Sequence, residues 1–302
     1  MEPLPESVLK RGYNPLIYGA LGCAMVILFF YQWISTPHVN PSPVTIHVSK
    51  GETLSEVAQE MQSHHIIRHA SAVRFFVHFF SFNGKVVTGD YTFDSDISAL
   101  GASYQLARAR HNVSPIRVTI KEGSTNEQIA DMLSQNLPGF RRDLFLEEVQ
   151  GMQGYLFPDT YFIYGLSTAD EIKNELSNTF TAKTGKLKES LASSGYTFNQ
   201  VITMASLIQK EAHGEEDASV ISGILWKRLR LGMLLQVDAA PSTYTVKGLP
   251  SEPIGNPGLT AIKAALEPTD SEYLFYLHDK NGMVHYATTF DEHKRNIAKY
   301  LR

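Results

Sequence analysis

An uncharged apolar run near the N-terminus constrains the fold of this chain more than any other feature. Residues 16–34 contain no charged side chain, and their length is close to the ~20 residues that a helix needs to cross a bilayer. Lys10 and Arg11 precede the run, and no Lys or Arg follows before Lys50. Because positive residues favour the cytoplasmic side of such a segment, we predict a cytoplasmic tail over residues 1–15 and an extracytoplasmic location for everything after residue 34.

A cleaved signal peptide is the competing interpretation of this run. A signal core is usually shorter, and residues 35–40 lack the small-x-small pattern of a cleavage site. The sequence therefore favours a retained single-pass anchor in the cell (inner) membrane. Residues 35–43 follow as a linker that contains three prolines, which would make it stiff.

Composition narrows the range of partners. The chain has 302 residues, of which 43% are hydrophobic and 19% charged, enough for one or two packed cores. Its net charge is −4 and no basic run interleaves with aromatics, so nucleic acid is not an expected partner. Cys23 is the only cysteine, which rules out an internal disulfide. His64, His65 and His69 lack a carboxylate partner pattern and are interpreted as surface residues, so no metal or cofactor is expected.

An internal repeat begins after the linker. Seven positions recur at a constant offset of 72 residues, as from Ile46 to Val118. The matching sets are Ile46, Val48, Gly51, Thr53, Val57, Ala58, Met61 and Val118, Ile120, Gly123, Thr125, Ile129, Ala130, Leu133. Each set predicts a short strand, a glycine turn, a threonine cap and an amphipathic helix.

The first copy, IHVSKGETLSEVAQEM, resembles a LysM module, a small βααβ domain that commonly binds N-acetylglucosamine polymers. The second copy, VTIKEGSTNEQIADML, is a weaker match. We therefore predict a LysM-like module over residues 44–137, with a simple spacer domain as the alternative. Between the copies, the Phe-rich residues 73–82 are predicted to form a core helix.

The remainder, residues 138–302, is predicted to be a mixed α+β domain, which makes the whole chain α+β. Helices are expected over residues 141–148, 169–191, 199–211 and 218–231, and short β-like runs from residue 236 onward. The segment 154–164 is dense in aromatics around a Pro158–Asp159 turn. Aromatic faces stack on sugar rings, so this segment is interpreted either as part of a carbohydrate groove or as a packed turn.

One carboxylate continues an apolar helical stripe. Met204, Leu207 and Ile208 share a helix face, and Glu211 follows on that face. A carboxyl group held among apolar neighbours should have a raised pKa, in the range useful for a general acid. Glu211 is therefore the leading catalytic candidate, and a frayed helix end that reaches water is the alternative. The acidic residues 215–217 are interpreted as the start of the next helix.

Several motifs occur in an order that resembles a known family, the endolytic peptidoglycan transglycosylases of the MltG or YceG-like type. They are GYLFPDTY at 154–161, ASLIQKEA at 205–212, RLRLGMLLQVD at 228–238, GLPSEPIGNPG at 248–258, AALEP at 264–268, and the pair Glu292 and His293. The resemblance covers nearly the whole chain after the apolar run.

The resemblance implies a bacterial cell-wall lyase with Glu211 as its catalytic residue. Such an enzyme cleaves the bond from N-acetylmuramic acid to N-acetylglucosamine within nascent glycan strands and leaves a 1,6-anhydro end. One carboxyl group can act first as the acid and then as the base. The implied partners are peptidoglycan strands, the membrane and peptidoglycan polymerases. The predicted substrate-binding residues are Gln236, Asp238, Tyr155, Asp159, Ser206, Arg228, Asn256 and Tyr244.

Two departures from the family pattern leave alternatives open. Gln209 occupies the first acidic position of the catalytic motif, and the loop after Asp238 is shortened, so that Ser242 stands where the family carries Asn. These departures motivate a second hypothesis, in which a weak or inactive glycan-binding scaffold recruits wall-synthesis enzymes. A true hydrolase is a third, with Asp238 as the nearest candidate for its second carboxylate.

Overall fold

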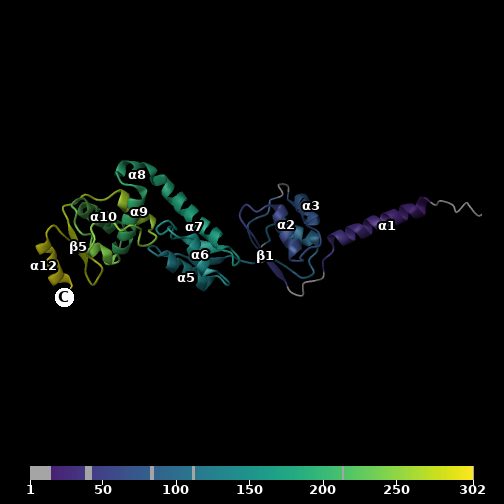
Figure 1. The fold of residues 1–302 in the computed structure, drawn as a ribbon, viewed down its shortest axis with the longest axis horizontal. Coiled ribbons are helices and arrows are strands. Elements are labelled where there is room, and N and C mark those ends of the chain that lie inside the picture. Colours follow the sequence, from purple (N-terminus) through teal and green to yellow (C-terminus); the bar gives the residue numbers. More distant parts are fainter. Residues whose placement is uncertain (1–14, 38–42, 82–84, 111–112, 213, 302) are drawn as a thin grey trace, which may run out of the picture. The chain divides into compact units, whose positions relative to one another are not determined.

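The computed structural model describes residues 15–37, 43–81, 85–110, 113–212 and 214–301. It divides into two compact units, Met1–Ser114 and Pro115–Arg302, which are treated separately below (Figure 1). Most of the predicted tail and part of the predicted linker lie outside the described residues. The fold is mixed α+β, and its sheets are two-stranded antiparallel pairs.

The first unit begins with helix α1 (Pro15–Ile34). Among the described residues, α1 is the one helix whose length and apolar composition suit a membrane span. Its large side chains, such as Met25 and Phe29, are exposed rather than packed in a core. These are the properties expected of a helix that faces lipid.

A βααβ unit follows, made of β1 (Val44–Val48), α2 (Leu54–Ser63), α3 (Ala70–Phe80) and β2 (Gly89–Phe93). Strands β1 and β2 pair antiparallel, with Ile46 opposite Tyr91, and helix α4 (Ala99–Ala107) completes the unit. Thr53 and Glu56 form a capping box that starts α2. The element order is the βααβ order expected of this segment, whereas its relation to LysM modules stays a prediction.

Helix α3 corrects the prediction of a core helix over residues 73–82. It ends at Phe80 and buries Ala72, Val73 and Val77, but Phe75 and Phe79 face outward. The correction has a physical reason: a helix packed on one side of a small two-stranded unit has only one face that the core can cover, so aromatic residues on the opposite face remain exposed.

The second unit begins with a second βααβ arrangement: β3 (Ile116–Thr119), α5 (Asn126–Asn136), α6 (Arg142–Glu148) and β4 (Thr160–Ile163). Each element begins 71 or 72 residues after its counterpart in the first unit, so the repeat extends over four elements rather than the strand and helix seen in the sequence. The division between the units falls after Ser114. It separates the two copies, whereas the predicted module over residues 44–137 contained the first copy together with β3 and α5 of the second.

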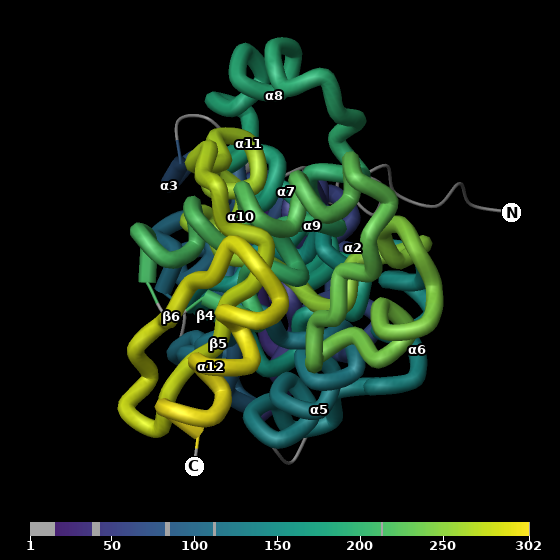
Figure 2. Tube along the Cα trace, turned by 90° about the vertical axis from the view of Figure 1, so that its left-hand side faces the viewer, coloured from purple at the N-terminus to yellow at the C-terminus, as the bar shows by residue number. Residues whose placement is uncertain are grey.

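The rest of the second unit is mainly helical. Its elements are α7 (Ala169–Thr184), η2 (Gly185–Leu187), α8 (Lys188–Ser194), α9 (Phe198–Glu211), α10 (Glu215–Arg230), η3 (Pro241–Tyr244), α11 (Leu259–Leu266), β5 (Phe275–His278), β6 (Val284–Ala287) and α12 (Phe290–Tyr300). Helices α9, α10 and α11 pack together (Figure 2). At their centre Trp226 is buried, and its indole Nε1–H donates to the carbonyl of Ala265 at 2.9 Å.

Candidate active site

Helix α9 carries the leading catalytic candidate at its last residue. Thr197 and Gln200 form the capping box that starts the helix, and every residue from Val201 to Ile208 is buried. The apolar stripe of Met204, Leu207 and Ile208 is therefore in the core, as the sequence predicted. Glu211 ends the helix but is only partly exposed.

A tyrosine from a distant strand holds the Glu211 carboxyl group. The hydroxyl of Tyr276, on β5, donates to Oε2 of Glu211 at 2.8 Å. Burial raises the pKa of Tyr276 well above its ordinary value, and the nearby Glu211 carboxylate raises it further. The tyrosine therefore stays protonated and acts as a donor, which fixes the orientation of the carboxyl group. A frayed helix end would lack such a partner.

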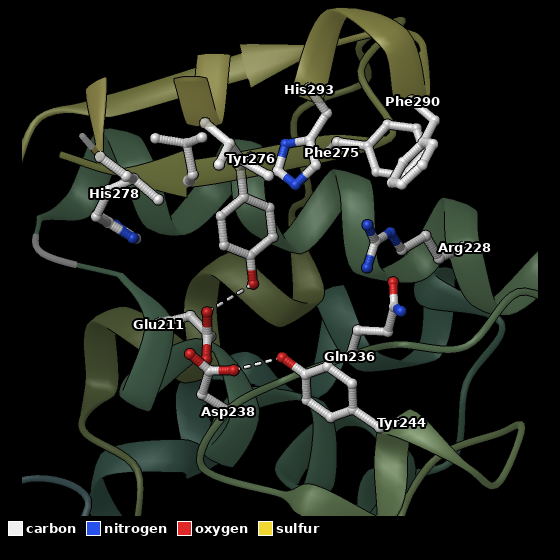
Figure 3. A pocket seen from close by; sticks show the side chains of 13 residues that line it. Glu211, Arg228, Gln236, Asp238, Tyr244, Phe275, Tyr276, His278, Phe290 and His293 are labelled. Carbon is white, nitrogen blue, oxygen red and sulfur yellow. Dashed lines mark hydrogen bonds between the residues drawn. The ribbon is translucent and has the colours of Figure 1, made fainter. Parts of the chain in front are cut away.

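Glu211 and Tyr276 line a pocket of about 420 Å³. Figure 3 shows that its walls come from the end of α9, from α10, from the segment before η3, and from the β5–α12 region. The lining residues are Glu211, Arg228, Gln236, Asp238, Tyr244, Phe275, Tyr276, Leu277, His278, Phe290, His293, Ile297 and Leu301. Five of the nine predicted site residues thus meet in one pocket, where aromatic and apolar surface adjoins polar groups, a combination typical of small-ligand sites.

Arg228 supplies the positive charge of the pocket. Its Nε donates to the carbonyl of Leu274 and its Nη1 to the carbonyl of Leu235, both at 2.7 Å. Its guanidinium also lies 5.1 Å from the centre of the Phe275 ring. Burial lowers the pKa of Arg228, and nearby Tyr276, Tyr244 and Glu211 act in the opposite direction. The guanidinium is thus a cation fixed by two backbone carbonyls, and its pKa responds to the charge of Glu211.

The segment before η3 brings a second carboxylate to the pocket. The hydroxyl of Tyr244 donates to Oδ1 of Asp238, and this bond is the main reason that the pKa of Tyr244 rises to about 12. Val237, which lies between Gln236 and Asp238 in the sequence, is buried, and its N–H donates to Oγ1 of Thr243 at 2.9 Å. The shortened loop is therefore held together by its own hydrogen bonds, and these place Tyr244 at the pocket.

Gln236 has an unusual backbone conformation. Its φ is +55°, in the left-handed region that residues other than glycine rarely adopt, and its N–H donates to the carbonyl of Thr243 at 3.1 Å. Its side chain points into the pocket toward Arg228 (Figure 3). Since such strain persists where the surroundings demand it, the conformation is consistent with a functional position.

Sequence reasoning missed the aromatic wall of the pocket. Phe275 stacks on His293 with ring centres 5.3 Å apart, and Phe290 lies 5.8 Å from Phe275. Burial lowers the pKa of His293, with a further contribution from Arg228, so its imidazole is held toward the neutral form. His293 belonged to a quoted motif. For Tyr276, the sequence offered only its place in a short β-like run, without any sign of a partner 65 residues earlier.

Four predicted substrate-binding residues lie outside the pocket, where they have structural contacts instead. Ser206 is buried; its hydroxyl donates to the carbonyl of Thr203 and accepts from the N–H of Ile254. The hydroxyl of Tyr155 donates to Oδ1 of Asn199 at 2.9 Å, and its ring packs on Phe180.

The other two are Asp159 and Asn256. Asp159 accepts from the N–H of Thr160 at 2.8 Å and pairs with Lys183 at 3.2 Å. Asn256 is fully buried, and its side chain makes four hydrogen bonds that join three segments of the second unit. They run from Gly154 N and Leu156 N to Oδ1, and from Nδ2 to Ser124 O and Asn126 Oδ1. These contacts give the motifs at 154–161 and 248–258 a structural role, in which their polar residues bind other parts of the protein and not the pocket.

Gln209, the departure at the first acidic position, is not among the pocket residues. Its Oε1 accepts from the N–H of Gly258 at 2.9 Å, at the start of α11. A carboxylate could accept the same bond, and the amide does so without a charge. The departure therefore alters a helix contact rather than the immediate surroundings of Glu211. Among the described residues, no group of three or more His, Cys, Asp or Glu is arranged to hold a metal ion.

Comparison with known proteins identifies the family of the chain. A model of the YceG-like family matches residues 46–241 and 242–299. The chain belongs to the YceG-like family. The match includes α9, the segment before η3 and nearly all of the β5–α12 region, so every pocket residue except Leu301 falls within the matched residues. The resemblance drawn from the ordered motifs is thus confirmed.

Two relatives carry the name endolytic murein transglycosylase. The one from Streptococcus pneumoniae serotype 2 is 23% identical over 322 residues, which cover 85% of this chain and 58% of that protein. The one from Bacillus subtilis is 25% identical over 308 residues, which cover 85% of each. The chain therefore spans little more than half of the pneumococcal protein and most of the other.

A solved structure has a related fold. A crystal structure of a yceG-like protein from Listeria monocytogenes matches 85% of this chain and 99% of its own, with a TM-score of 0.56 and 24% identity. At this identity the likeness concerns the fold, which it supports over most of the chain.

Proposed function

We propose that this protein is an endolytic peptidoglycan lytic transglycosylase with Glu211 as its single acid and base. The observation that carries the proposal is the position of Glu211: it occupies the catalytic position of the family motif and lines the pocket with its carboxyl group bound by Tyr276. The name shared by the relatives from S. pneumoniae and B. subtilis supports the same class of reaction.

In the proposed first step, protonated Glu211 gives its proton to the glycosidic oxygen between N-acetylmuramic acid and N-acetylglucosamine. The bond from this oxygen to the anomeric carbon breaks, and positive charge develops on the muramyl ring. In the second step, the muramyl 6-hydroxyl oxygen bonds to the anomeric carbon and its proton passes to the Glu211 carboxylate. The anhydro ring closes, no water is consumed, and Glu211 returns to its starting state.

The neighbours of Glu211 suit these two steps. The hydroxyl of Tyr276 holds Oε2 in both protonation states, so the carboxyl group stays oriented for proton transfer. The Arg228 cation would stabilise the carboxylate that exists between the steps. Asp238, held by Tyr244, would place negative charge near the developing oxocarbenium ion. Gln236 remains a candidate for binding sugar hydroxyl or amide groups.

The proposed location is the outer side of the inner membrane, with α1 as a single-pass anchor and the N-terminus in the cytoplasm. The length and exposed apolar surface of α1 support the anchor, and the charge asymmetry around residues 16–34 supports the orientation. Nascent strands and the polymerases that make them are the partners this location would offer. We propose that residues 138–302 form the catalytic domain. We also propose that the LysM-like first copy binds glycan.

The test is mass spectrometry of products from purified glycan strands incubated with the full chain. We expect 1,6-anhydro ends, and we expect Glu211→Gln to lower their rate of formation by about 10²–10⁴-fold, the usual contribution of a general acid or base. Glu216→Gln is the matched control, because this exposed carboxylate on the next helix is not a pocket residue. Full activity of Glu211→Gln would refute the assignment.

A second variant addresses the departure at Gln209. Because its amide contacts Gly258 rather than the pocket, Gln209→Glu should change the rate by less than about three-fold, well under 1 kcal/mol of barrier height. A large gain would instead indicate that the natural chain is the weak or inactive scaffold of the alternative hypothesis.

A hydrolase is the second candidate function, favoured by the presence of Asp238 in the same pocket. Digestion in H₂¹⁸O separates the two reactions, since hydrolysis places ¹⁸O in new reducing ends and the lytic reaction leaves unlabelled anhydro ends. A scaffold would bind strands without creating either end.

A further inference from the structure

Helix α3 presents an aromatic face that the core does not use. The face consists of Phe75, Phe76, Phe79 and Phe80, and Phe75 and Phe79 are 55% and 75% exposed. The rings of Phe75 and Phe76 lie 5.2 Å apart and those of Phe79 and Phe80 5.7 Å apart, and the two pairs follow each other at i, i+4 spacing on one side of the helix. A contiguous exposed apolar surface of this kind usually marks an interaction site.

This face is continuous with the end of the apolar helix α1. The ring of Trp33, in the last turn of α1, lies 5.8 Å from Phe75 and 6.0 Å from Phe76. The indole Nε1–H donates to Oγ of Ser71 at 3.0 Å, and Nε of Arg68 donates to the carbonyl of Thr36 at 3.1 Å. Helix α3 is therefore fastened to the C-terminal end of α1.

Positive side chains lie beside the aromatic face. Tyr104 of α4 packs on Phe80 with ring centres 5.5 Å apart. The guanidinium groups of Arg108 and Arg110 lie 5.8 Å and 5.1 Å from the Tyr104 ring. Both arginines are exposed, and neither forms a salt bridge within the described part of the chain. Aromatic rings beside unpaired arginines are the composition of segments that lie in a bilayer interface.

We propose that the α3 aromatic face inserts into the outer leaflet of the membrane that α1 spans, with Arg108 and Arg110 on anionic phosphate headgroups. The proposal rests on the membrane anchoring included in the proposed function. A tryptophan at the end of a span sits at headgroup depth, and the rings that touch it share that depth. The first unit is then held against the bilayer by a second contact besides α1.

The experiment uses the full chain in vesicles of phosphatidylethanolamine and phosphatidylglycerol, with an environment-sensitive dye on one cysteine at a time. Native Cys23 reports on α1. In a Cys23→Ser background, Phe79→Cys reports on the aromatic face and Gln59→Cys on the exposed surface of α2. The readouts are the emission wavelength and its quenching by nitroxide-labelled lipid. Circular dichroism verifies that each variant is folded.

The proposal expects a blue shift and lipid quenching at positions 23 and 79, and neither at position 59. Quenching at position 79 should weaken in neutral phosphatidylcholine vesicles, because the arginines lose their anionic partners. Quenching at position 23 without quenching at position 79 overturns the proposal and leaves the anchor intact. No quenching at position 23 overturns the anchor itself. Dye-to-dye quenching at position 79 that falls as the protein is diluted in lipid would assign the face to a second copy of the chain and also overturn the proposal.

Discussion

The two βααβ copies share their local construction and differ in what contacts them. Both begin their first helix with a threonine capping box, at Thr53 and at Thr125, and both make the preceding turn with a glycine of positive φ. A side chain at Gly51 would meet nothing within 4 Å, whereas one at Gly123 would lie 3.3 Å from both Gln209 and Lys210. The second copy thus supports α9, the helix that carries Glu211.

The loop that contains Asn256 completes this support. The N–H of Gly123 donates to the carbonyl of Asn256 at 2.7 Å, and the N–H of Asn256 donates to the carbonyl of Ser124 at 2.9 Å. The first copy instead leaves its corresponding turn open and exposes an aromatic helix face. Two copies of one small unit therefore differ: the second contacts the helices that line the pocket, and the first keeps an exposed aromatic surface.

The largest expected effect comes from Asn256→Ala, which removes four buried side-chain hydrogen bonds and leaves the N–H groups of Gly154 and Leu156 without their acceptor. We expect the second unit to lose about 3–5 kcal/mol of stability. Asn136→Ala, at an exposed position on α5, should change stability by less than about 0.5 kcal/mol. Chemical denaturation monitored by Trp226 fluorescence measures both. A loss below 1 kcal/mol for Asn256→Ala would mean that the second copy is not a support.

A smaller effect is expected from substitutions at the two glycine turns, Gly51 of the first copy and Gly123 of the second. Gly51→Ala and Gly123→Ala should each cost about 1–2 kcal/mol, because alanine is strained at positive φ. Only Gly123→Ala should also slow strand cleavage, by about ten-fold, since Gln209 and Lys210 must move and α9 carries Glu211. The comparison of cleavage rates under conditions where both variants are folded tests this. Equal rates would contradict the functional difference between the copies.

The smallest expected effect is a pH dependence that comes from one carboxylate of the second copy, Asp159. Bonds from Thr160 N–H and then Lys183 lower the pKa of Asp159, directly before β4, whereas uncharged Thr88 precedes β2. A carboxylate with a lowered folded-state pKa stabilises above its unfolded pKa, and this contribution disappears as pH falls through the folded value. Since Asp159 is partly exposed, we expect only a few tenths of a kcal/mol after solvent screening.

The measurement is the melting temperature of the wild type and of Asp159→Asn between pH 7 and pH 3. The small deficit of the variant at pH 7 should shrink below about pH 3.8, the ordinary pKa of a free Asp side chain. A deficit that stays constant to pH 3 would show that the hydrogen bonds of Asp159 do not depend on its charge.

The sequence predicts those features of the structure that depend on the local pattern of residues. The capped helices, the Gly turns, the apolar span and the buried stripe on α9 follow from spacing and propensity, and the family motifs located Glu211, Arg228, Gln236, Asp238 and Tyr244. Contacts between distant segments were not predictable: the partner of Glu211 lies on β5, and Asn256 was assigned to substrate although it is buried. A polar residue within a family motif gives the same pattern in a sequence whether its side chain binds a ligand or the protein's own backbone.

The four bonds of Asn256 also bear on the order in which the chain can fold. The link from Asn256 to Ser124 joins residues 132 positions apart, whereas the Thr45–Thr92 bond between β1 and β2 spans 47. Distant contacts carry a larger cost of loop closure and form late. We therefore expect the first unit to complete its fold once α4, which ends at Ala107, is available, and the second copy to remain unfinished until residues 253–258 arrive. A chain emerging from its N-terminus would hold an intact first unit while the pocket of the second unit is still unassembled.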